Sequence, residues 1–173
     1  MWVILGVLLL FRGLLAAIEA ALHAISDTDA RALADKSSAG RRVSALKADP
    51  EATAAALRTG MVLSGFMAAA IGAMVPPRLL DVSLARLSES TILTSFTPLL
   101  SALLVALVAT LLDMSLRSAA LQRAEAWALT LSFLASAAVS TLYPLVKTLI
   151  FPVKVLLRPF NAKVSFQAPP PPL

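Results

Sequence analysis

Four long apolar stretches constrain the fold of this chain more than any other feature of its sequence. They cover about residues 2–25, 59–76, 96–116 and 126–157. A helix needs about 20 mainly apolar residues to cross the ~30 Å hydrocarbon core of a bilayer, and the first three stretches are close to that length. Because 58% of the residues are hydrophobic, 14% are charged and the mean hydropathy is +0.83, the chain cannot cover itself with a polar surface in water. The sequence therefore predicts an all-α integral membrane protein.

The fourth stretch, residues 126–157, differs from the other three. Pro144 and Pro152 interrupt it, and Lys147, Lys154 and Arg158 recur along its second half and just beyond it. Prolines remove helix hydrogen bonds, and regularly spaced lysines favour a position at the membrane surface. We therefore predict three transmembrane helices followed by a proline-broken interfacial helix, which forms a juxtamembrane belt.

The distribution of basic residues predicts the orientation. A cleaved signal peptide is the competing interpretation of the N-terminus, but Arg12 lies inside the first apolar run instead of before it. Only Arg78 and Arg86 lie between the second and third stretches. Many more basic residues follow the first and third stretches: Arg31, Lys36, Arg41, Arg42, Lys47, Arg58, Arg117, Arg123, Lys147, Lys154, Arg158 and Lys163. The positive-inside rule then places the N-terminus outside and the C-terminus in the cytoplasm, in the cytoplasmic (inner) membrane. These flanking positions explain the net charge of +5 without a nucleic-acid partner.

Residues 26–50 and the C-terminal tail are the two polar segments with recognisable local patterns. Ser26 and Asp29 have the spacing of a capping box, and Asp49 with Pro50 marks a break and a restart of helix. We predict a cytoplasmic helical hairpin here. Residues 161–173 end in a polyproline run that is typical of an extended linker. The predicted membrane domain thus covers residues 1–160.

Three ionisable residues lie within the first apolar stretch. Arg12, Glu19 and His23 fall on one face of a helix, which also carries small residues at intervals of four, including Gly13 and Ala17. Small residues at this spacing allow another helix to approach closely in lipid. Arg12 and Glu19 could offset each other's charge across ~10.5 Å of helix rise, or Glu19 could be functional, as intramembrane acids often are. His23 near the interface is expected to snorkel or to form a hydrogen bond.

The third stretch ends with Asp113, four residues before Arg117. One interpretation is an i,i+4 ion pair, worth a few tenths of a kcal/mol. The other is a divalent-cation site, because the predicted topology brings Asp113, Glu19, Gly60 and Ser64 to the same half of the membrane. Mg²⁺ prefers about six oxygen ligands at ~2.0 to 2.1 Å. The spacing leaves both interpretations open.

Several other classes of site are disfavoured. The chain has no cysteine and one histidine, which disfavours thiolate and multi-histidine metal sites. No nucleophile lies in a recognisable arrangement with a base, so we do not expect an enzyme.

The order of these features resembles the membrane domain of the CNNM/CorC family of magnesium transport proteins. The first helix ends in AAIEAALHAIS, the second span begins with LRTGMVLSGF, and LLDMSLRSAALQRAEAWAL precedes the proline-interrupted segment. The likeness runs to about Phe160. It implies a dimer, and a Mg²⁺ site built from serine and asparagine oxygens and an acid between the three spans. The glutamate of the family's first-helix motif corresponds to Glu19. The acid of its third-span motif corresponds to Asp113.

The family's other ligand positions are replaced. Its serine corresponds to Ala16, and the two asparagines that follow Gly60 correspond to Met61 and Val62, none of which offers a side-chain oxygen. The resemblance therefore leaves two hypotheses: a dimeric divalent-cation transporter, or a member with a degenerate ion site that acts as a membrane scaffold or as a regulatory partner of another membrane protein. The family also carries ATP-binding CBS domains, and we expect no nucleotide site in this chain.

Overall fold

The computed structural model describes residues 1–74 and 91–157, and within these ranges it contains helices and no strand. The predicted all-α class is confirmed. The tail at 161–173, together with Arg78 and Arg86, lies outside the described residues. The helices are α1 (Trp2–Ala24), α2 (Asp27–Lys36), α3 (Ser38–Ala48), α4 (Pro50–Met74), α6 (Thr91–Gln122) and α7 (Ala124–Leu157).

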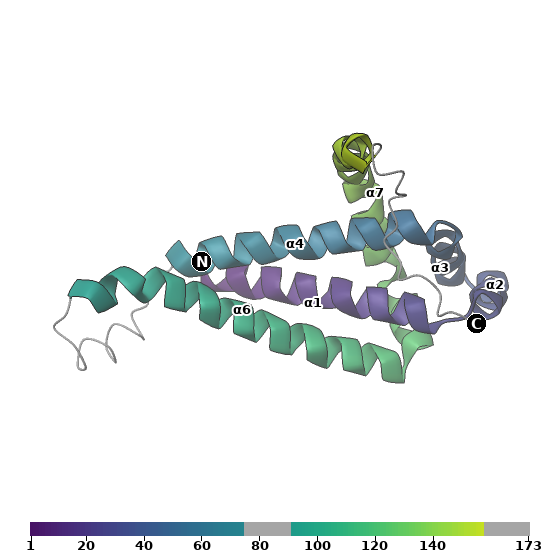
Figure 1. Ribbon diagram of the computed structural model, residues 1–173. Coiled ribbons are helices and arrows are strands. Elements are labelled where there is room, and N and C mark those ends of the chain that lie inside the picture. Colours follow the sequence, from purple (N-terminus) through teal and green to yellow (C-terminus); the bar gives the residue numbers. More distant parts are fainter. Residues whose placement is uncertain (75–90, 158–173) are drawn as a thin grey trace, which may run out of the picture.

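Three long helices form the body of the molecule, and α1 lies between α4 and α6 (Figure 1). The second half of α1 is buried almost all round, with Leu15 and Ala17 fully covered. Its small residues permit this close packing. Gly13 is one such position, since a Cβ there would lie 2.6 Å from the side chain of Leu116 on α6. Helix α1 is therefore surrounded by protein over its charged half.

The predicted helical hairpin consists of α2 and α3, at the end of the bundle where α1 finishes (Figure 1). The Ser26 hydroxyl caps α2 by accepting a hydrogen bond from the backbone N–H of Asp29 at 3.1 Å, and Ser37 caps α3 in the same way. The two helices touch at Gly40, where a Cβ would overlap the backbone carbonyl of Leu33. Helix α4 then begins at Pro50, whose fixed φ suits the first position of a helix.

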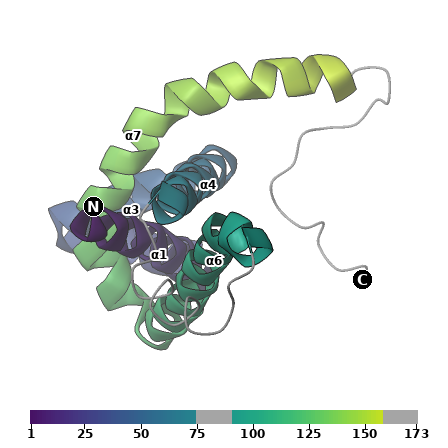
Figure 2. The ribbon, with the colours of Figure 1, turned by 90° about the vertical axis from the view of Figure 1, so that its left-hand side faces the viewer.

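Helix α7 crosses the bundle (Figures 1 and 2). It runs at a steep angle to α1, α4 and α6 and curves around one side of them, packing on α4, α1 and α3. The prediction that prolines break this segment was wrong, because the helix continues through Pro144 to Leu157. A proline removes one hydrogen bond of the helix ladder, and the turns on either side can keep theirs, so a long, packed helix bends instead of ending.

The helices that contain the second and third predicted spans are longer than those spans. Helix α4 begins at Pro50, before residue 59, and α6 extends beyond 96–116 at both ends. Hydropathy identifies the apolar part of a helix, whereas the alanine-rich turns that precede the apolar part of α4 are good helix formers without being strongly apolar. By length and composition, four helical segments of the described chain could cross a membrane: Trp2–Ala24, Pro50–Met74, Pro98–Gln122 and Ala124–Thr148.

Candidate functional site

Glu19 lies at the centre of a charge cluster formed by three helices. Its side chain on α1 is only 6% exposed, and both carboxylate oxygens accept hydrogen bonds from arginines. Arg58 Nε on α4 is 2.8 Å from Oε1, and Arg117 Nη2 on α6 is 3.0 Å from Oε2. Because α1 lies between α4 and α6, one carboxylate reaches guanidinium groups on both neighbours. Such charge-assisted bonds compensate the cost of burying an acid.

A second ion pair lies closer to the N-terminal end of α1. Arg12 Nε donates to Asp113 Oδ2 at 2.9 Å, which joins α1 to α6. The guanidinium lies against Gly65 of α4, where a Cβ would overlap Arg12 Nη1. Asp113 Oδ1 is buried and has no hydrogen-bond partner within the described part of the chain. The Asp113 carboxylate therefore has one oxygen paired and one available.

The observed ion pairs differ from those that the sequence analysis considered. The first interpretation joined Arg12 to Glu19 within α1 and Asp113 to Arg117 within α6, whereas the structure joins Arg12 to Asp113 and Arg117 to Glu19. Arg12 and Glu19 are separated by ~10.5 Å along one helix, while packed helix axes lie about 8 to 10 Å apart and allow long side chains to bridge them. Pairing between α1 and α6 also gives the buried Glu19 a charged partner.

Arg58 is the member of this cluster that sequence reasoning missed. It was counted only as a basic residue flanking the second span. The available signal was helical periodicity, because Arg58, Met61 or Val62, and Gly65 recur every three or four residues on α4. That stripe includes both Arg58 beside Glu19 and Gly65 beside Arg12.

The other two predicted cation ligands have packing and backbone partners. A Cβ at Gly60 would lie 2.8 Å from the Leu15 side chain, so the glycine marks a close approach of α4 to α1. The Ser64 hydroxyl donates to the Gly60 carbonyl of its own helix at 2.7 Å. Within residues 1–74 and 91–157 no three His, Cys, Asp or Glu side chains gather in a group that could hold a metal. A metal role for Glu19, Asp113, Gly60 and Ser64 stays a prediction.

The three replaced ligand positions have different environments. Ala16 is buried in the α1 core, Met61 is partly buried, and the Val62 side chain is 55% exposed on the outside of α4. All three side chains are apolar, so none supplies an oxygen to the site.

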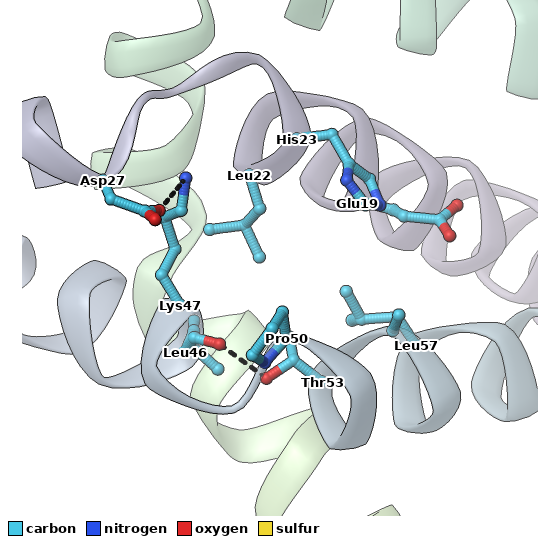
Figure 3. A pocket seen from close by; sticks show the side chains of 10 residues that line it. Glu19, Leu22, His23, Asp27, Leu46, Lys47, Pro50, Thr53 and Leu57 are labelled. Atoms are coloured by element: carbon cyan, nitrogen blue, oxygen red, sulfur yellow. Dashed lines mark hydrogen bonds and ion pairs between the residues drawn. The ribbon is translucent and has the colours of Figure 1, made fainter. Parts of the chain in front are cut away.

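A polar pocket of about 270 Å³ lies between the end of α1, α3 and the start of α4 (Figure 3). Lys47 reaches across it, forming an ion pair with Asp27 at 3.0 Å and a hydrogen bond to the Ile25 carbonyl. The hydrogen bond and charge of Lys47 lower the pKa of Asp27 below its ordinary value of 3.8. On the other wall, the Thr53 hydroxyl donates to the Leu46 carbonyl at 2.8 Å. These contacts fasten the hairpin to α1 and α4.

A comparison with known protein families identifies the family of this chain. The family model described as the Cyclin M transmembrane N-terminal domain, CNNM, matches residues 3–170. The chain belongs to the CNNM family. No curated protein and no solved structure matched it. The match covers nearly the whole chain, so the described helices constitute a CNNM membrane domain, and the protein is an integral membrane protein.

Proposed function

We propose that this chain is a CNNM-family membrane domain with a degenerate ion site, which serves as a non-transporting scaffold or regulatory partner in the membrane. The observation that carries this proposal is the Arg12–Asp113 pair. The resemblance assigns Asp113 to the family's cation-binding acid, and here that acid already binds a guanidinium supplied by the same chain. Arg12 thus acts as a fixed cation where a mobile one would bind.

The charge balance supports the same conclusion. Among the described residues, Arg12 pairs with Asp113, and Arg58 and Arg117 both pair with Glu19, so each acid already has at least one arginine as partner. At an effective dielectric constant of about 20, a divalent ion about 4 Å from a guanidinium would be repelled by roughly 8 kcal/mol. Mg²⁺ also gives up its water reluctantly, and the side chains of Ala16, Met61 and Val62 offer it no oxygen.

A second candidate function is divalent-cation transport by a dimer of this domain. The observation that favours it is Asp113 Oδ1, a buried carboxylate oxygen without a hydrogen-bond partner in the described residues. An unpaired buried oxygen is costly and is satisfied by an ion or by water. In this candidate Arg12 would leave Asp113, and Gly60 and Ser64 would line the path.

Magnesium flux distinguishes the two candidates. Proteoliposomes containing the wild type, Asp113→Ala or no protein are loaded with a Mg²⁺-sensitive dye, and Mg²⁺ is added outside. The proposal predicts equal entry in all three preparations. Flux in the wild type that exceeds empty vesicles and disappears in Asp113→Ala would establish transport instead.

We also propose the predicted topology of three crossings with the N-terminus outside. The steep crossing of α7 over the bundle, near the end where the hairpin lies, supports its assignment as a belt at the membrane surface (Figure 1). The chain has no cysteine, so single cysteines introduced at exposed Trp2 and at exposed Ser38 can be labelled without background. A membrane-impermeant maleimide should label intact cells at position 2 and only lysed cells at position 38. The reverse pattern would refute the orientation.

A further inference from the structure

Two adjoining pockets on the outside of the bundle share Met61 of α4. The first, which we call the arginine pocket, has a volume of about 560 Å³ and is lined by Glu19, Ala20, His23, Arg58, Met61, Arg117 and Leu121. The second, which we call the apolar pocket, has a volume of about 320 Å³ and is lined by Arg12, Met61, Val62, Gly65, Phe66 and Ala69. Together they offer a cationic part and a mainly apolar part. An anionic phospholipid has the complementary parts, a negative headgroup and an apolar acyl chain.

The arginine pocket is lined by two arginines and one acid. Arg58 and Arg117 each donate a hydrogen bond to the carboxylate of Glu19. Their side chains are 48% and 50% exposed, and the His23 side chain beside them is exposed too. Half-exposed guanidinium groups can donate further hydrogen bonds to an anion, and arginine suits the geometry of phosphate.

The position of the arginine pocket along the helices corresponds to the edge of the bilayer. Glu19 and Arg117 each lie five residues before the end of their helix, and Arg58 lies eight residues after the start of α4. These offsets amount to roughly 7 to 12 Å of helix rise. All three helix ends lie on the side of the polar hairpin (Figure 1). In the proposed topology, the arginines therefore lie near the depth of lipid phosphates in the leaflet next to the hairpin.

The apolar pocket continues from Met61 towards the other end of α4. Val62 and Phe66, which line it, are 55% and 73% exposed on the face that lipid would cover. An acyl chain can thus enter this pocket sideways from the bilayer. A free phosphate ion has no apolar part that would occupy it.

We propose that the two pockets bind an anionic phospholipid, with its phosphate on Arg58 and Arg117 and an acyl chain along Val62 and Phe66. This binding is independent of whether the domain transports an ion, because it uses the half-exposed side chains of Arg58 and Arg117 and not Asp113.

The test is native mass spectrometry of the full chain in detergent, titrated with phosphatidylglycerol or with phosphatidylcholine of the same acyl chains. The wild type should bind phosphatidylglycerol at least about tenfold more tightly, the factor expected for one charge-assisted hydrogen bond. Arg117→Gln should lose that preference, while Glu19 keeps Arg58 as partner. Arg41→Gln, which removes the same charge from an exposed position on α3, should retain it.

A second measurement keeps the proposal testable if Arg117→Gln is poorly folded. In nanodiscs, phosphatidylglycerol should raise the melting temperature of the wild type and of Arg117→Lys, which keeps the charge, above that in pure phosphatidylcholine. Equal preference for both lipids in the wild type, or equal loss in Arg117→Gln and Arg41→Gln, would overturn the proposal. Equal protection by inorganic phosphate in pure phosphatidylcholine would also overturn it, since the pocket would then bind free phosphate instead of lipid.

Discussion

Replacing Glu19 by glutamine tests whether the charge cluster holds α1, α4 and α6 together. The substitution keeps the size of the side chain and removes its charge. Glutamine can accept from one arginine through its carbonyl oxygen, but its NH₂ group then faces the other guanidinium, donor against donor. Glu19 itself is only 5% exposed, so compensation by water is available mainly to the arginines and not to the new glutamine.

The expected cost follows from the two hydrogen bonds and the exposure of their donors. A hydrogen bond to a charged group typically contributes about 1.5 to 3 kcal/mol. Arg58 and Arg117 are half exposed, so water recovers part of this energy when the acid is lost. We expect Glu19→Gln to lower the free energy of unfolding by about 2 kcal/mol, and Arg117→Gln by about 1 kcal/mol, because Arg58 then still pairs with Glu19.

The assay is unfolding in mixed micelles with increasing SDS, followed by circular dichroism at the helical band. Glu51→Gln is the matched control, since Glu51 is an exposed glutamate near the start of α4 and its replacement should change stability by no more than about 0.5 kcal/mol. A stability of Glu19→Gln equal to that of Glu51→Gln would refute the reasoning, because the arginine contacts would then contribute nothing to the packing of the three helices.

Two further predictions concern the hairpin and its attachment. Gly40→Ala should destabilise the protein by about 1 to 3 kcal/mol in the same SDS titration, because the new methyl group meets the rigid backbone carbonyl of Leu33. Gly6→Ala is the control: nothing lies within 4 Å of its new Cβ, so the substitution should leave stability unchanged or raise it. Lys47 lowers the pKa of Asp27 in the folded state, so the stabilisation from this pair is present above pH about 4 and is lost as the pH falls through the lowered pKa. The SDS midpoint should therefore drop between pH 5 and pH 3 by more in the wild type than in Lys47→Met, and equal drops would contradict the role of this pair.

Local patterns in the sequence were sufficient to predict several parts of the fold. The capping spacing of Ser26 and Asp29 and the break at Asp49 and Pro50 fix the start of α2 and of α4, because a cap or a proline acts on the backbone within one turn. The limits of the apolar stretches were less informative. Helix α7 continues through Pro144, and two residues later Val146 packs on Ala55 and Ala56 of α4. Such tertiary packing is not visible in a local pattern.

The charge cluster shows the same limit at the level of side chains. The sequence indicates that Arg12, Glu19 and Asp113 need partners, since charges within apolar spans are expensive. It does not indicate which residues those partners are. The pairing depends on the placement of α1 between α4 and α6, which brings Arg58 and Arg117 to Glu19 and Arg12 to Asp113.

The most direct test of the central claim is whether Mg²⁺ protects the purified domain against heat. An occupied site at ten times its Kd would add about 1.4 kcal/mol of stability. We predict no saturable rise in melting temperature when Mg²⁺ is added to the wild type, relative to the same ionic strength of NaCl, because Arg12 already neutralises Asp113. A saturable rise in the wild type that disappears in Asp113→Asn would contradict this account.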